Sequence, residues 1–246
     1  MNKIRIDTLL VEKKLVPSRQ KAQALIMAGC VLVDEVPVEK PGQRVFEDAM
    51  IRIKGEDHPY VSRGGVKLAR ALEEFGCEVA GRTCMDVGAS TGGFTDCLLK
   101  AGAARVYAID VGYGQLASKV AKDERVVVMD RINIRKLERR DIADDVDLAV
   151  IDVSFISLKL VLPKVNEFLA KRADIIALIK PQFEVGRDRV GKGGIVRDAA
   201  SHEIAINNVI EAGHALGLGD QGVIESPIKG AKGNKEFLIH FKNSDQ

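Results

Sequence analysis

Apolar residues recur at helical spacing near the start of the chain, in residues 6–10 and again in residues 22–26. Pro17 and Ser18 lie between these stretches, where they predict the end of one helix and the N-cap of the next. Gly29 follows the second stretch, at the position where a C-terminal cap belongs. The pattern therefore predicts two short helices separated by a turn.

Behind the second helix, the spacing changes to an alternation of apolar and polar residues. Alternate valines in residues 31–38 flank an acidic turn and predict a small hairpin, and a last short strand is expected at residues 50–53. Residues 1–58 are thus expected to form a small α+β domain. Residues 54–62 lose this periodicity, and residues 59–62 are expected to be a linker.

From residue 63 onward, buried strands alternate with helical stretches, among them residues 93–101 and 201–216. Strand patterns lie at residues 83–87, 106–109, 126–129, 148–151, 175–179, 222–224 and 236–241. This alternation predicts a doubly wound, mostly parallel seven-stranded sheet of Rossmann-like α/β class. Only a loop joins the last two strands, which predicts an antiparallel hairpin at the sheet edge. Residues 63–246 are therefore expected to form one α/β domain.

Composition fits a globular protein but does not decide its partner. The chain of 246 residues is 46% hydrophobic and 29% charged, with a net charge of only +2. Residues 1–30, however, hold six basic side chains against two acidic ones. With no acid expected to offset this helix face, phosphate binding is favoured over a merely solvated surface. The candidate RNA-binding residues are Arg5, Lys13, Lys14, Arg19 and Lys21.

The four cysteines form no C-x-x-C pair, and the histidines are not clustered with them in the sequence. No secretory signal precedes them, so we expect reduced thiols in a cytoplasmic protein and no metal site. No apolar run approaches the roughly 20 residues that a membrane-spanning helix needs. A membrane partner is therefore not expected.

A glycine-rich turn follows the first strand of the second region, which ends near Asp86. Glycines let the backbone approach a ligand, and a helix N-terminus offers free N–H groups to anionic groups. The dinucleotide pattern G-x-G-x-x-G is absent, so an ordinary strand-to-helix turn is the alternative. Candidate cofactor contacts in this turn are Gly88, Ser90, Thr91, Gly92, Gly93 and Phe94.

Acidic residues also end the second and third strands. Asp110 lies 22 residues after Gly88 and could accept hydrogen bonds from both ribose hydroxyls of a nucleoside. Asp130 could meet an adenine amino group. Together with Asp86 they would form a polar rim around an adenosine-sized cleft, although acids at strand ends also cap helices.

Two further segments invite a chemical interpretation. Residues 186–192 match most of the ATP-binding pattern G-x-x-x-x-G-K-[ST], but Gly193 replaces the hydroxyl residue, so a mobile basic loop is the better interpretation. Asp152 and Lys180 directly follow the fourth and fifth strands. Their position at the carboxyl edge of the sheet favours catalysis, with a structural ion pair as the alternative.

These residues resemble those of a known family. The second region is similar to the FtsJ-like ribose 2′-O-methyltransferases, and the whole chain resembles the TlyA family of rRNA methyltransferases, often labelled hemolysin-like. That family joins a small S4-type RNA-binding domain to such an enzyme. The resemblance is most specific in Ser62-Arg63-Gly64-Gly65-Val66-Lys67-Leu68, Asp152-Val153-Ser154-Phe155-Ile156-Ser157 and Lys180-Pro181-Gln182-Phe183-Glu184.

The resemblance implies S-adenosylmethionine as cofactor and ribosomal RNA, within a ribosomal subunit, as partner. It implies methylation of a cytidine 2′-hydroxyl in 16S or 23S rRNA, and a catalytic tetrad at Lys67, Asp152, Lys180 and Glu236. We expect Lys180 to accept or steer the hydroxyl proton, while the two acids orient the lysines. A lysine accepts a proton only in its neutral form, which partial burial and a nearby positive charge favour. No metal is required.

Three alternatives remain at the level of sequence. An RNA-binding assembly factor with vestigial catalysis is disfavoured by the intact tetrad positions. A hemolysin-like membrane-active protein is disfavoured by the lack of apolar spans and of tryptophan. A nucleotide-dependent oxidoreductase is disfavoured by the missing G-x-G-x-x-G pattern. The sequence leaves the oligomeric state open between a monomer and a weak homodimer.

Overall fold

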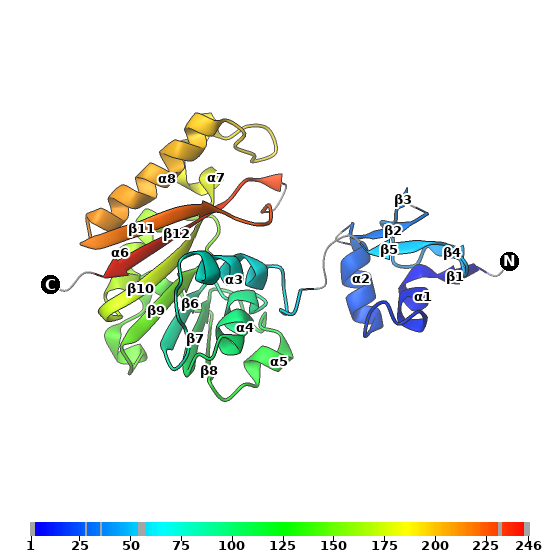
Figure 1. Ribbon diagram of the computed structural model, residues 1–246, viewed down its shortest axis with the longest axis horizontal. Coiled ribbons are helices and arrows are strands. Elements are labelled where there is room, and N and C mark those ends of the chain that lie inside the picture. Colours follow the sequence, from blue (N-terminus) through cyan, green and yellow to red (C-terminus); the bar gives the residue numbers. More distant parts are fainter. Residues whose placement is uncertain (1–2, 28, 35, 54–57, 231–232, 244–246) are drawn as a thin grey trace. The chain divides into compact units, whose positions relative to one another are not determined.

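The computed structural model describes residues 3–27, 29–34, 36–53, 58–230 and 233–243. They belong to two units, Met1–Asp57 and His58–Gln246, each with its own core (Figure 1). Residues 59–62, expected as a linker, lie in the second unit. The Val61 amide donates to the Asp96 carboxylate over 2.9 Å, and Tyr60 and Val61 pack against the core. These contacts with residues distant in the sequence leave no periodic pattern, which is why the segment resembled a linker.

The first unit packs two helices against short strands. Leu9, Leu10 and Ile26 are buried in its core, and the Ser18 hydroxyl accepts a hydrogen bond from the Lys21 amide, as its predicted capping role requires. Gly29 has a φ of +67° behind the second helix. The elements are β1 (Lys3–Arg5), α1 (Ile6–Glu12), α2 (Arg19–Met27), β2 (Val31–Val33), β3 (Val36–Pro37), β4 (Arg44–Phe46) and β5 (Ile51–Ile53).

The β1–β4 pair was not expected from the sequence. Both strands are three residues long, and charged residues flank one apolar residue in β1, so no run of alternation is visible. The expected hairpin is present as β2 and β3, and β5 pairs with the other edge of β2. The small α+β domain is therefore as predicted, apart from this two-stranded ladder.

The second unit is a seven-stranded sheet with helices on both faces. Its main elements are α3 (Gly64–Glu74), β6 (Thr83–Val87), α4 (Gly93–Lys100), β7 (Arg105–Asp110), α5 (Ser118–Ala121), β8 (Val126–Asp130), β9 (Val146–Ile151), α6 (Leu162–Asn166), β10 (Leu169–Ile179), α7 (Pro181–Glu184), α8 (Ala199–His214), β11 (Leu218–Glu225) and β12 (Phe237–Asn243). The strand order is β11-β12-β10-β9-β6-β7-β8, and β12 runs antiparallel to both of its neighbours. The predicted Rossmann-like sheet with its antiparallel edge is confirmed.

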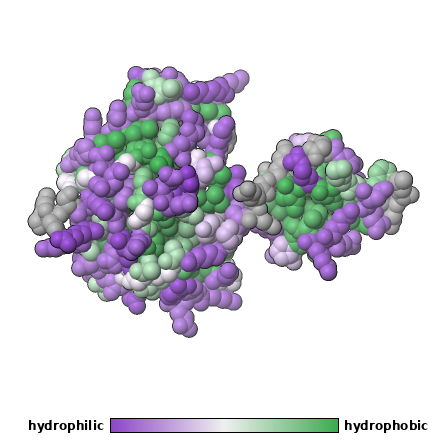
Figure 2. All heavy atoms as spheres, in the orientation of Figure 1, coloured by the Kyte–Doolittle hydropathy of each residue, from purple (hydrophilic) through white to green (hydrophobic). Residues whose placement is uncertain are grey.

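Alternate residues along each strand face opposite cores. In β6, Met85 belongs to the core cluster that includes residues of α6 and α8, while Cys84 belongs to the cluster that includes residues of α3 and α4. Figure 1 shows where these helices lie. Parallel strands need both faces covered, which explains their nearly continuous apolar runs. On the face shown in Figure 2, polar residues cover most of the larger unit.

The strand order reverses between β6 and β9, because the chain runs outward from β6 through β7 to β8 and then returns to the other side of β6. Ligands of doubly wound sheets bind at such a point, outside the carboxyl ends of the strands. The turn after β6 and the residues after β9 meet there, so the sheet topology brings the predicted glycine turn beside Asp152.

Candidate active site

At Gly88 the glycine turn approaches the residue after β9 too closely to allow a side chain. Gly88 has a φ of +89°, and a Cβ added to it would lie 2.5 Å from the Asp152 carbonyl oxygen. Gly92 has a φ of +90°, and a Cβ there would lie 2.7 Å from Leu116. Conformation therefore favours glycine at both positions, and at Gly88 the Asp152 backbone also leaves no space for a side chain.

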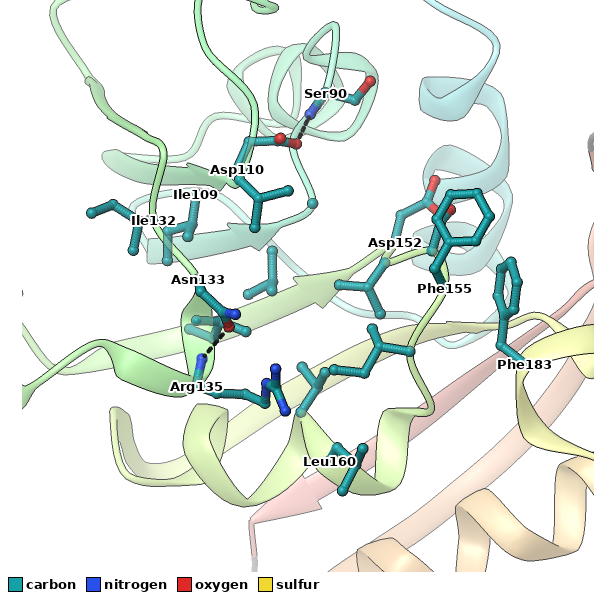
Figure 3. Close-up of a pocket in the computed structure, with 18 of the residues that line it drawn as sticks. Ser90, Ile109, Asp110, Ile132, Asn133, Arg135, Asp152, Phe155, Leu160 and Phe183 are labelled. Atoms are coloured by element: carbon teal, nitrogen blue, oxygen red, sulfur yellow. Dashed lines mark hydrogen bonds between the residues drawn. The ribbon is translucent and has the colours of Figure 1, made fainter.

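A cavity of about 850 Å³ opens beside this turn (Figure 3). Asp110 and Ser90 lie along one wall, with Ile109 and Ile132 nearby, and Phe155 lies across the opening. The Asp110 carboxylate accepts hydrogen bonds from the backbone amides of Ser90 (2.8 Å) and Gly112 (2.7 Å). Two bonds leave carboxylate lone pairs for further donors, so Asp110 fits the predicted ribose contact.

Asp86, in contrast, does not reach the predicted rim. It is fully buried, and its Oδ2 accepts a hydrogen bond from the Thr95 hydroxyl over 2.6 Å. No described residue donates a hydrogen bond to its Oδ1. Burial raises the pKa of Asp86 to about 7, against the lowering effect of the Thr95 hydrogen bond, and the charge of Asp152 raises it further. Asp86 lies within β6, where residue parity turns its side chain into the core instead of toward the cavity.

Asp130 also falls short of the predicted rim. Its carboxylate accepts the Gly114 amide over 2.7 Å, and it is not among the described residues that line the cavity. Ile132 and Asn133, just beyond the strand, line the wall instead (Figure 3). Sequence reasoning missed both, because neither is charged or part of a motif; only their position after the third strand pointed to this edge.

A smaller cavity of about 250 Å³ continues from the larger one. Gly88, Ser90 and Asp152 line both. Of the other predicted turn residues, Thr91, Gly93 and Phe94 line only the smaller cavity, and Gly92 lines neither. Residues from distant parts of the chain also line the smaller cavity: Ser62, Arg63, Gly64, Lys67, Ile228, Lys229 and Gly230. The two cavities therefore meet at the glycine turn and Asp152.

The four predicted tetrad residues form two ion pairs around this junction. Lys180 Nζ lies 2.5 Å from Asp152 Oδ1 and donates to the Ser154 hydroxyl over 2.8 Å. Lys67 Nζ lies 2.6 Å from Glu236 Oε2, with both side chains buried. Asp152 and Lys67 line the smaller cavity. Lys180 contacts Asp152, and Glu236 contacts Lys67.

Two aromatic side chains that were not predicted as site residues lie at the mouth of the larger cavity. Phe155 is 90% exposed and has a φ of +65°, and its ring centroid lies 5.3 Å from that of Phe183 (Figure 3). Both line the cavity. A bulky residue in left-handed conformation stores strain, which persists where function favours it. This pair therefore belongs to the candidate site.

Away from the site, the fold assembles a cluster that the sequence did not suggest. Potential ligand atoms of Cys77, Asp174 and His240 lie within 4.8 Å of one another. The Asp174 carboxylate is shared by His240 Nε2 (2.7 Å) and Arg82 Nη1 (2.6 Å). Because the Arg82 cation already neutralises this carboxylate, the cluster is an ion-pair network. Cysteine and histidine are thus clustered in space, although not in sequence.

The first unit corrects the assumption that no acid offsets its basic face. Arg5 and Arg19 both contact the buried carboxylate of Asp7 and remain partly exposed. Lys13 and Lys14 are exposed at the end of α1, and Lys21 of α2 is half-buried.

In the described ranges, no helix is long and apolar enough to cross a membrane.

The sheet, the glycine turn and the adjoining cavity with Asp110 define an S-adenosylmethionine-dependent methyltransferase. A family model described as FtsJ-like methyltransferase matches residues 60–243, and one described as S4 domain matches residues 4–51. The chain belongs to the TlyA family, in which an S4 domain precedes an FtsJ-like methyltransferase domain.

Individual relatives agree with this assignment. The 16S/23S rRNA (cytidine-2′-O)-methyltransferase TlyA of Mycobacterium tuberculosis is 46% identical, over 97% of this chain and 89% of the relative. Hemolysin A of Brachyspira hyodysenteriae is 42% identical over 97% and 99%. A solved Streptococcus thermophilus structure described as a hemolysin has a TM-score of 0.80 at 41% identity, covering all of this chain and 90% of that one.

Proposed function

We propose that this protein transfers a methyl group to the 2′-hydroxyl of a cytidine in 16S or 23S rRNA, within a ribosomal subunit in the cytoplasm. The observation that carries the proposal is the junction of the two cavities at Asp152, where Lys180 Nζ lies 2.5 Å from the carboxylate. The name of the M. tuberculosis relative supports the nucleotide and both rRNAs, and that of the Campylobacter jejuni relative supports 23S rRNA.

The larger cavity fits S-adenosylmethionine. Its volume of about 850 Å³ is in the range of small-molecule sites, and Asp110 offers carboxylate lone pairs for ribose hydroxyls. Ile109 and Ile132 supply an apolar wall for the adenine, and Asn133 supplies a polar group beside it. When bound, the cofactor supplies an electrophilic methyl group. Because Gly88 has no side chain, the turn would leave room for the cofactor beside the smaller cavity, which Lys67 and Asp152 line.

The two ion pairs then position the acceptor and handle its proton. A ribose hydroxyl becomes nucleophilic only as it loses its proton, so a basic group must stand within hydrogen-bond reach. Lys180 is that group when neutral or, when charged, steers the proton to the Asp152 carboxylate, and its contacts with Asp152 and Ser154 restrict its position. Glu236 restricts Lys67 in the same way. Orientation of the hydroxyl in line with the methyl group would supply much of the rate.

Phe155 and Phe183 fit the role of a support for the target base. An exposed ring at the cavity mouth offers a face on which an unstacked base can pack, and base–aromatic stacking contributes about 1–3 kcal/mol. Sequence-specific RNA recognition commonly uses such splayed bases. The aromatic pair would therefore hold the cytidine beside Lys180 while the S4 domain contacts phosphates elsewhere.

The decisive experiment compares Lys180→Ala with the wild type in tritiated methyl transfer to separated 30S and 50S subunits. We expect transfer to be lost while S-adenosylmethionine still binds in calorimetry. Lys164→Ala is the matched control, because Lys164 is also ion-paired, to Glu167, but lines neither cavity. Retained transfer by Lys180→Ala would remove Lys180 from the mechanism. A wild type that binds subunits without modifying them would instead indicate an assembly factor.

A further inference from the structure

Asp7 is a buried acid in the middle of a basic surface. Its side chain is fully buried, whereas those of Arg5 and Arg19 are 45% and 54% exposed. Arg5 donates to it through Nε and Nη2, both over 3.0 Å, and Arg19 donates through Nε over 2.9 Å. Gln23 adds a bond of 3.2 Å from the next turn of α2. One carboxylate thus gathers donors from β1 and two points of α2.

The geometry anchors both guanidinium groups on Asp7 and fixes the orientation of Arg5. The paired bonds to the two Asp7 oxygens set the plane of the Arg5 guanidinium, since such fork contacts are geometrically specific. Gly42 leaves space beside it, because an added Cβ would lie 3.3 Å from Arg5 Nη1. Arg5 Nη2 and Arg19 Nε share the same Asp7 oxygen. The two cations are therefore neighbours, and without the acid between them they would repel each other.

Only part of each guanidinium is used in these contacts. The bonds to Asp7 engage Nε and Nη2 of Arg5 and Nε of Arg19, so Nη1 of Arg5 and both Nη groups of Arg19 can donate elsewhere. The hydrogen bonds from Arg5 hold the pKa of Asp7 well below its usual range, so the acid stays charged at physiological pH. The cluster keeps a net charge of about +1, carried by two guanidinium groups that share one anchor.

We propose that Asp7 is a positioning residue for RNA binding, which holds Arg5 and Arg19 side by side as a two-pronged site for phosphodiester groups of rRNA. This inference rests on the proposed function. The expected direction of the change in RNA affinity is unusual. Removing a negative charge from a nucleic-acid-binding surface should ordinarily strengthen binding, because binding scales with the positive charge presented. Here the same change should weaken it, because the arginines lose their common anchor.

The test compares two variants of the full-length protein with the same change in charge. Asp7→Asn removes the buried acid, and Glu12→Gln removes an exposed acid at the end of the same helix. Binding to purified ribosomal subunits is measured over a range of salt concentrations. We expect Asp7→Asn to bind roughly tenfold more weakly, with the slope of log K against log salt smaller by about 1–2. Glu12→Gln should bind as well as the wild type or slightly more tightly.

Further readouts separate positioning from general loss of structure. The affinity for S-adenosylmethionine and the turnover at saturating subunits should be unchanged in Asp7→Asn, while the KM for subunits rises. In an Arg5→Ala/Arg19→Ala background, Asp7→Asn should cause no further loss, since its effect acts through those arginines. Arg19→Lys keeps the charge and the acid but loses the fork, so it should also bind more weakly.

Two results would overturn the inference. One is a folded Asp7→Asn protein that binds subunits as tightly as Glu12→Gln. The other, which decides the matter if Asp7→Asn does not fold, is wild-type affinity in Arg19→Lys. A wild-type protein that neither binds nor methylates either subunit would instead refute the proposed function, so the two failures are distinguishable.

Discussion

The buried carboxyl group of Asp86 should make the stability of the protein depend on pH. Its pKa is about 7 in the folded state, against 3.8 for the ordinary group, chiefly because burial disfavours the charged form. The folded protein therefore binds this proton more tightly than the unfolded chain does. It follows that the contribution of Asp86 to stability is greatest below pH 4, falls as pH rises toward 7, and is level above that.

The size of the effect follows from the shift. A rise of about three pKa units corresponds to about 4 kcal/mol, since each unit contributes about 1.4 kcal/mol. Asp86 is fully buried, so solvent does not screen this cost. Asp86→Asn has nearly the same shape and can still accept the Thr95 hydroxyl through its amide oxygen. The variant should therefore match the wild type at pH 4 and exceed its stability by up to about 4 kcal/mol at pH 8.

Urea denaturation followed by circular dichroism, at several pH values from 4 to 8, measures this difference; the chain has no tryptophan for fluorescence. Glu184 also has a pKa raised by burial and acts in the same direction. Because Glu184 is present in both proteins, subtracting the two curves removes its contribution. Parallel curves over the whole range would refute the argument that Asp86 carries an uncompensated buried charge.

Two further substitutions test the geometry of the cavities. Gly88→Ala should weaken S-adenosylmethionine binding in calorimetry by tenfold or more, because the added Cβ would meet the Asp152 carbonyl. Gly76→Ala is the control for backbone strain alone, because Gly76 has a φ of +59° but open space around its Cβ. Phe155→Ala should raise the KM for ribosomal subunits by roughly 5- to 100-fold without changing cofactor affinity. Leu160 is also exposed and lines the same cavity, and Leu160→Ala should leave this KM nearly unchanged. Unchanged values in Gly88→Ala or Phe155→Ala would contradict the corresponding assignment.

The sheet could be predicted from the sequence because each strand is a dense apolar run bounded by turns. The observed β6 and the start of β8 coincide with the expected residues 83–87 and 126–129. In contrast, β10 begins at Leu169, six residues before the predicted start at 175, because charged residues interrupt its early part. The spacing of apolar residues therefore located the strands, but it could not predict the exposed, charged start of β10.

Site residues were harder to predict than strands, because a shared motif does not fix the direction of a side chain. Asp86, Asp110 and Asp130 all stand at strand ends, yet only Asp110 lines the cavity. Phe155 gave no signal in the spacing, since its exposure depends on a single left-handed backbone position. Position at the carboxyl edge of the sheet was a sound guide to the region, while individual contacts depended on residue parity and on loop conformation.

Asp7 and Asp86 show that burial alone does not determine how an acid behaves. Both side chains are fully shielded from solvent, yet the pKa of Asp7 is lowered and that of Asp86 is raised. The difference lies in their partners. Two arginines contact Asp7, whereas the hydrogen bonds from Thr95 do not offset the burial of Asp86, and the charge of Asp152 opposes its ionisation. Asp7 therefore stabilises its unit at neutral pH by remaining charged, and Asp86 destabilises its own by losing a proton. Between pH 5 and 8, a change of pH should act on the methyltransferase core and leave the Asp7 anchor of the RNA-binding surface intact.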